Sequence, residues 1–88
     1  MKKTALNLFC LQLENLTLTK DVRLDETIKA LEHDIAEHGL IEPLVVRRSF
    51  VVDSGNRRLR AIIHLYYYDN EAYHKQFPKG IPCIELNL

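Results

Sequence analysis

The chain has 88 residues, 47% of them hydrophobic and 27% charged, as expected for one folded domain spanning residues 1–88 rather than for two domains or a disordered chain. Lysine plus arginine equals aspartate plus glutamate at 12 each, which excludes an overall basic excess for non-specific binding to nucleic acid. No apolar run approaches the ~18 residues of a membrane span and no signal peptide is visible, so we expect a cytoplasmic protein without a membrane partner.

The first half of the chain predicts strands followed by a helix. Residues 5–19 alternate between leucine and other side chains, which favours one or two strands with a turn at Glu14-Asn15. Asp25 is placed to cap a helix that ends at His38, before Gly39. The expected buried stripe of this helix is Leu24, Ile28, Leu31 and Ile35, and the expected outward residues are Lys29, Glu32, His33 and Glu37.

The middle of the chain predicts a hairpin that leads into a second helix. Pro43 introduces a strand at Leu44–Arg47, and a short reversal at Arg48-Ser49 precedes a second strand at Phe50–Val52. Asp-Ser-Gly then favours a tight turn. Apolar side chains at helical spacing predict a helix over Asn56–Tyr68.

The last part predicts a short helical segment at Glu71–Phe77 and a final strand at Ile81–Leu86. Cys10 and Cys83 lie in alternating apolar runs without metal-ligand spacing, so we expect both to be small buried strand residues. The expected fold is a small single domain of the α/β (α+β) class, with a mixed sheet and two main helices.

Arginines gather at the start of the second predicted helix. A helix N-terminus carries free N–H groups and partial positive charge, so cations there are unfavourable unless an anion is bound. Glycine allows close backbone approach, asparagine can cap, and arginine binds phosphate through two parallel hydrogen bonds. The predicted phosphate site is therefore Gly55, Asn56, Arg57, Arg58 and Arg60. The alternative is a solvated basic turn neutralised by Asp53 or other acids, and composition alone does not choose between them.

Two carboxylates, Asp53 and Glu42, are expected near this turn. They are the candidates for a catalytic base or for ligands of a phosphate-bridged divalent metal, although pairing of Asp53 with an arginine is the commoner arrangement. None of the four histidines stands at a ligand spacing, so no resident metal site is predicted. The consecutive tyrosines that end at Tyr68 point in several directions, and core packing is expected for Tyr66.

Two motifs carry a family resemblance. Residues 39–46 (GLIEPLVV) match the pattern G-[IL]-[IL]-x-P-[IL]-x-V, and residues 55–61 (GNRRLRA) match G-x-R-R-x-x-A. With the predicted order of elements, the chain resembles the N-terminal domain of the ParB and sulfiredoxin-like superfamily over roughly residues 13–86. The resemblance implies that Gly55, Arg57 and Arg58 grip nucleotide phosphates, while Glu42 and Pro43 border the nucleotide.

The resemblance also implies ligands and partners. CTP is bound by ParB proteins that load on DNA, and ATP is used by sulfiredoxins; either would be accompanied by Mg²⁺. Sulfiredoxins carry their catalytic cysteine where Asn56 stands here, so sulfiredoxin activity is not expected. ParB proteins usually carry glutamate there. They also continue into a helix-turn-helix beyond the position of Leu88, so a complete chain of this length would work with a larger protein partner.

Two functions therefore stay open. The first is a ParB-like module that binds a nucleotide, DNA phosphates or both, and acts as a regulator or accessory factor in a DNA-related process. The second is a small enzyme of the same fold, such as a nuclease, an NTPase or a phosphoryl-transfer relative of kinases. The absence of an activated nucleophile or a clear acid-base pair in the sequence favours the binding module.

Overall fold

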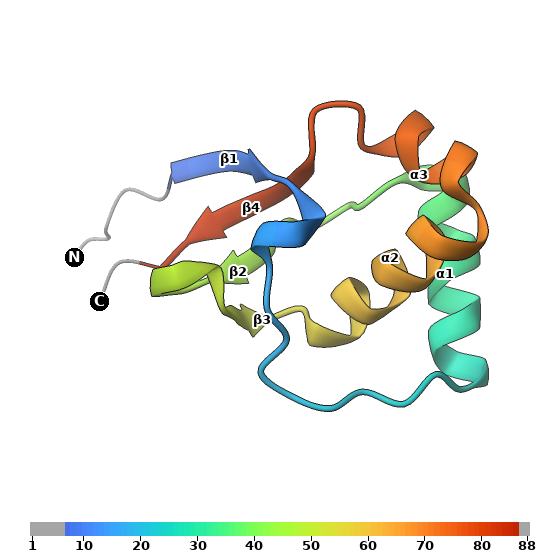
Figure 1. Ribbon diagram of the computed structural model, residues 1–88, viewed down its shortest axis with the longest axis horizontal. Helices are drawn as coiled ribbons and strands as arrows, with labels where there is room; N and C mark the ends of the chain where they lie inside the picture. The colour runs from blue at the N-terminus through green and yellow to red at the C-terminus, as the bar shows by residue number, and fades with distance from the viewer. Residues whose placement is uncertain (1–6, 87–88) are drawn as a thin grey trace.

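The computed structural model describes residues 7–86, which form an α+β fold with a four-stranded mixed sheet (Figure 1). The elements in chain order are β1 (Asn7–Leu11), the 3-10 helix η1 (Leu13–Asn15), α1 (Glu26–His38), β2 (Leu44–Val46), the 3-10 helix η2 (Arg48–Phe50), β3 (Val52–Ser54), α2 (Asn56–Tyr68), α3 (Asn70–Gln76) and β4 (Ile81–Glu85). The predicted fold class and both main helices are confirmed.

The sheet has the strand order β1-β4-β2-β3, so the last strand of the described chain lies between earlier ones (Figure 1). β4 pairs antiparallel with β1 and parallel with β2, while β2 and β3 form the predicted antiparallel hairpin. Thr17 forms a parallel bridge with Val51, and Thr17 also accepts a hydrogen bond from the Val52 amide at 2.9 Å. The segment before α1 therefore covers part of the β3 edge, which reduces the unpaired backbone that an edge strand exposes.

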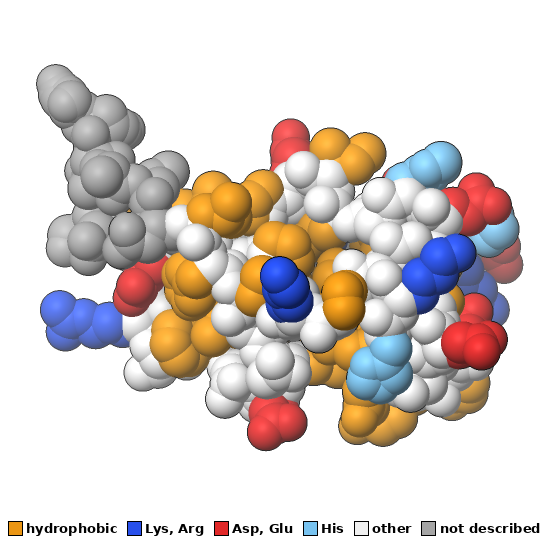
Figure 2. Space-filling model, turned by 90° about the horizontal axis from the view of Figure 1, so that it is seen from above, with side chains coloured by type: hydrophobic (Ala, Val, Ile, Leu, Met, Phe, Trp, Pro, Cys, Tyr) orange, Lys and Arg blue, Asp and Glu red, His pale blue; other side chains and the backbone are white. Residues whose placement is uncertain are grey.

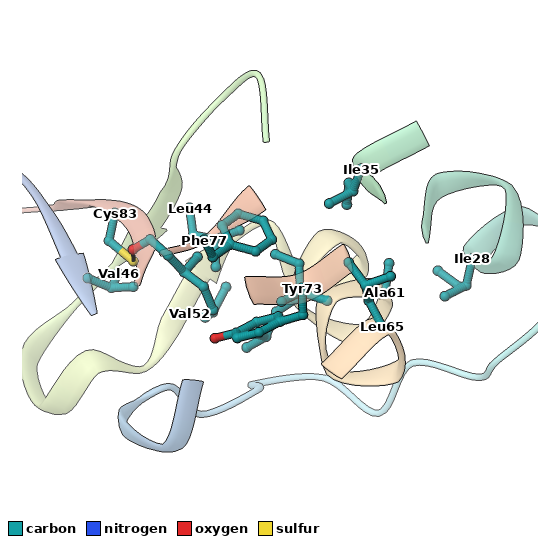
Figure 3. Close-up of a cluster of buried hydrophobic side chains, with 13 residues drawn as sticks. Ile28, Ile35, Leu44, Val46, Val52, Ala61, Leu65, Tyr73, Phe77 and Cys83 are labelled. Carbon is teal, nitrogen blue, oxygen red and sulfur yellow. Dashed lines mark hydrogen bonds between the residues drawn. The ribbon is translucent and has the colours of Figure 1, made fainter. Parts of the chain in front are cut away.

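The core lies between the sheet and the helices (Figure 3). Burial alternates along β2, where Leu44 and Val46 are fully buried and Val45 is not, as expected for a sheet with one covered face. The helices contribute Ile28 and Ile35 from α1, together with Leu59, Ala61, Ile62 and Leu65 from α2 and Tyr73 from α3. Tyr66 packs against this cluster, as predicted. The packing fixes α2 with its first turn beside β2 and β3.

The ends of α1 follow the local sequence. The Asp25 carboxylate accepts a hydrogen bond from the Ile28 amide at 3.0 Å and so caps the helix. Gly39 ends it with φ 77°, a conformation that L side chains rarely adopt. Both capping predictions are confirmed.

The strand predicted at Phe50–Val52 is misplaced, because the reversal takes more residues than the sequence suggested. Ser49 and Phe50 both have positive φ, 64° and 59°, and form η2. The Phe50 amide bonds to the Arg47 carbonyl and the Arg47 amide to the Val51 carbonyl, each at 2.9 Å. β3 therefore begins at Val52 and extends through Ser54, directly up to the glycine of the candidate site.

The two cysteines differ in exposure, so the prediction that both are buried is wrong for Cys10. β1 lies at the sheet edge, and its Phe9 and Leu11 pack against the core, which turns Cys10 outward. Cys83 is fully buried in central β4. Burial raises the pKa of the Cys83 thiol to about 11, so this group stays protonated and unreactive near neutral pH.

We expect a thiol reagent at pH 8 to modify Cys10 quickly and Cys83 at least about a hundredfold more slowly, since the latter requires the core to open. Counting modified thiols by mass spectrometry should give one fast group in the native protein and two in denaturant. A Cys10→Ser variant, which should show no fast group, is the control. Equal rates for both native thiols would contradict the assignment.

Candidate functional site

The candidate site begins where β3 turns into α2. Gly55 is the N-cap of α2, with φ 109° and ψ 20°. A Cβ at this position would lie 2.7 Å from Cδ2 of buried Leu44, so close packing against β2 requires glycine. Because glycine offers no side-chain acceptor, the amides of the first turn receive no cap from it. The positive helix end therefore has no side-chain acceptor for its first backbone N–H groups.

Asn56 does not cap α2, so that expectation is wrong. Its side chain is nearly buried and bonds to Thr19, 37 residues earlier: the Thr19 amide donates to Oδ1 and the Asn56 Nδ2 donates to the Thr19 hydroxyl, each at 2.9 Å. That hydroxyl donates in turn to the Val52 carbonyl at 2.7 Å. The Asn56 side chain therefore links the segment before α1 to the start of α2. The Asn56 backbone amide is the first N–H group of α2.

Arg57 and Arg58 hold positions on opposite sides of the turn. Arg57 Nη2 donates to the Thr27 hydroxyl at 2.7 Å, and that hydroxyl donates to Asp25 at 2.6 Å. The hydrogen bonds from Thr27 and from the Ile28 amide lower the pKa of Asp25, with a smaller contribution from Arg57. Arg58 Nη2 lies 2.9 Å from the Glu42 carboxylate. Each guanidinium has further N–H donors beyond the one in its contact.

These residues surround a hollow of about 510 Å³, which is lined by Asp53 through Arg58 together with Lys20, Val22 and Leu31. A smaller hollow of about 250 Å³ adjoins it and shares Leu31 and Arg58; Glu42 lines this second one. Arg60, although predicted as part of the site, lies elsewhere. Its Nε donates to the Val22 carbonyl at 3.2 Å, and it lines a different hollow with His64 and Tyr68.

Each of the two candidate carboxylates forms an ion pair with an arginine. Asp53 lies 2.9 Å from Arg47 Nε, as the commoner reading of the sequence expected, and Glu42 pairs with Arg58. Pro43 follows Glu42 and leads directly into β2. Within residues 7–86, His, Cys, Asp and Glu side chains form no group of three that would hold a metal ion.

One polar pair was missed by sequence reasoning. His64 Nδ1 of α2 lies 2.7 Å from the Glu32 carboxylate of α1, and both side chains are mostly buried. The prediction that Glu32 faces outward is therefore wrong. Its position four residues after Ile28 was the available signal, because residues at that spacing share a helix face. The pair joins α1 to α2 away from the hollow at Gly55.

The model of the ParB N-terminal domain family matches residues 6–79. The chain therefore belongs to the ParB N-terminal domain family. Its structure is similar to a solved structure described as a Pnob8-like ParB-N domain in its C2221 form, with a TM-score of 0.67 and 18% sequence identity. The match covers 100% of this chain and 32% of that one, and it shows the shared fold.

Curated proteins give no match to this chain. Within the part of the chain that the structure describes, no helix combines the length and apolar character needed to cross a membrane.

Proposed function

We propose that this ParB-like module binds the phosphates of a nucleotide at the N-terminus of α2, and acts as a regulator or accessory factor in a DNA-related process. The observation that carries the proposal is the uncapped helix end at Gly55, which opens with Arg57 and Arg58 into one hollow. Backbone amides, the helix dipole and two guanidinium groups there all favour an anion. The family resemblance suggests CTP or ATP with Mg²⁺ as the ligand.

The size of the site supports a compact ligand. A hollow of about 510 Å³ lies within the range of roughly 300–1,000 Å³ that small-molecule sites occupy. The face shown in Figure 2 carries acidic, basic and apolar side chains side by side, and no broad basic area covers it. This view is from the side of β1 and α3, and the N-terminus of α2 lies on the far side. The hollow at Gly55 fits one compact ligand, so we propose a nucleotide as the direct ligand and DNA as a target of the larger assembly.

The enzyme alternative receives less support from the geometry. A base or metal ligand at the site would come from Asp53 or Glu42, and each is held by an arginine at 2.9 Å. Neither carboxylate lies among enough ligand-type side chains in residues 7–86 to form a metal cluster. The binding module is therefore the proposal, with hydrolysis as a measured control.

The test is a titration of the ¹⁵N-labelled protein with CTP, ATP and a short DNA duplex, each with and without Mg²⁺, followed by amide chemical shifts. We expect saturable shifts at the amides of Gly55 through Leu59 for a nucleoside triphosphate. Cytidine and adenosine, which lack phosphate, are the matched ligand controls and should not bind there. Saturation by the nucleosides alone, or no binding by any phosphate ligand, would overturn the proposal. Release of nucleoside diphosphate, measured in the same samples, would favour the enzyme instead.

A further inference from the structure

Arg58 stands at the boundary between the two adjoining hollows, because it lines both of them. On one side it lines the hollow at the N-terminus of α2, where the ligand phosphate is proposed to bind. On the other side its Nη2 lies 2.9 Å from the Glu42 carboxylate. The same guanidinium therefore already holds an anion that belongs to the protein.

Glu42 is placed so that it can leave. Its side chain is 71% exposed, whereas that of Arg58 is 34% exposed. It belongs to the stretch between the end of α1 at His38 and the start of β2 at Leu44, which contains no helix or strand. A solvent-exposed ion pair of this kind is weak and reversible. A ligand that approaches Arg58 therefore has to displace Glu42 from a single contact, the one between Arg58 Nη2 and the Glu42 carboxylate.

We propose that Glu42 is a specificity-determining residue that competes with the ligand phosphate for Arg58; this inference rests on the proposed function. Carboxylate and phosphate accept hydrogen bonds from the same guanidinium N–H groups, so Glu42 and a ligand phosphate cannot both form a bidentate pair with Arg58 through the same two donors. A carboxylate left beside the bound phosphate also repels it. Every anion must therefore overcome Glu42. The repulsion grows with the charge of the ligand, so Glu42 lowers the affinity for a polyphosphate by a larger factor than the affinity for inorganic phosphate.

The test compares wild type with Glu42→Gln, which keeps the size of the side chain and removes its charge. Affinities for inorganic phosphate, tripolyphosphate and CTP are measured by calorimetry without Mg²⁺. We expect Glu42→Gln to bind each about two- to fivefold more tightly, the range that loss of an exposed ion pair implies. The proportional gain should be larger for tripolyphosphate than for inorganic phosphate, because tripolyphosphate carries more negative charge. Asp34→Asn removes the same charge from a residue that lines the same hollow, and it should have a smaller effect.

A double-mutant cycle with Arg58→Ala locates the effect. In the Arg58→Ala background, Glu42→Gln should raise affinity less than in wild type, because the competed guanidinium is gone and only the repulsion between Glu42 and the ligand remains. If wild type binds and Glu42→Gln binds equally or more weakly, this inference alone is overturned. Weaker binding by Glu42→Gln only in the presence of Mg²⁺ would also overturn it, because Glu42 would then act as a metal ligand. Absence of binding by wild type and by Glu42→Gln would overturn the proposed function and this inference together.

Discussion

Replacing Gly55 by alanine is expected to lower the free energy of unfolding by about 2–4 kcal/mol. The left-handed conformation at φ 109° costs an L residue about 1–2 kcal/mol, and overpacking against Leu44 adds about 1–3 kcal/mol. Alanine also lowers the conformational entropy of the unfolded chain, but this stabilises the folded protein by only about 0.4–1 kcal/mol. For a domain of this size the loss corresponds to a fall in Tm of roughly 10–30 °C.

Gly39→Ala is the matched control for this experiment. Gly39 also has positive φ, 77°, but its added Cβ would meet the end of the flexible Gln76 side chain at 3.0 Å rather than a buried leucine. We expect Gly39→Ala to cost about 1 kcal/mol, since strain remains and the collision is relieved by side-chain movement. Chemical denaturation of both variants measures the difference. Equal losses at the two positions would contradict the role assigned to Leu44.

Arg57→Ala and Arg58→Ala are each expected to weaken binding of a nucleoside triphosphate by about 10- to 100-fold, since a hydrogen bond to a charged group contributes about 1.5–3 kcal/mol. The same variants should change the free energy of unfolding by less than about 0.5 kcal/mol. Each loses an exposed partner worth about 0.2–1 kcal/mol, Thr27 or Glu42, and each relieves a similar repulsion at the positive helix end. Calorimetric titration and denaturation of the same samples measure both quantities.

Arg60→Ala and Arg48→Ala serve as charge controls. Arg60 lies on α2 itself but donates to the Val22 carbonyl and lines another hollow. Arg48 is exposed in η2, outside the hollow at Gly55. Both should bind nucleotide within about twofold of wild type at moderate salt, where distant charges are screened. A destabilised Arg57→Ala or Arg58→Ala protein with unchanged affinity would show that these arginines serve the fold rather than a ligand.

The helices were predictable because their signals are local. Asp25 and Gly39 mark the ends of α1 through bonds and dihedrals within a few residues, and the apolar spacing of α2 survives in the structure. The reversal after β2 was less predictable. Arg48-Ser49 carries no glycine or asparagine to announce positive φ, yet Ser49 and Phe50 adopt it. As a result β3 starts later than expected.

The candidate site was predictable at its backbone and less so at its side chains. Gly55, Arg57 and Arg58 meet at one helix end, as the motif indicated. The partners of the other residues come from distant parts of the chain: Thr19 for Asn56, and Val22 for Arg60. Such contacts span 37 and 38 residues, so no local pattern encodes them. The parallel pairing of β2 with β4 likewise joins distant parts of the chain, so no local pattern predicts it.

The central position of β4 also has a consequence for the order in which the chain can fold during synthesis on the ribosome. Residues 26–76 supply the helices and the β2-β3 hairpin, but β1 has no neighbour in the sheet until Ile81–Glu85 pairs with it. Closing that distance costs chain entropy before any long-range contact is gained. The nascent chain therefore completes its sheet only after residue 85 has left the exit tunnel. Until then β1, and the side of β2 that faces β4 in the folded sheet, have no strand to pair with.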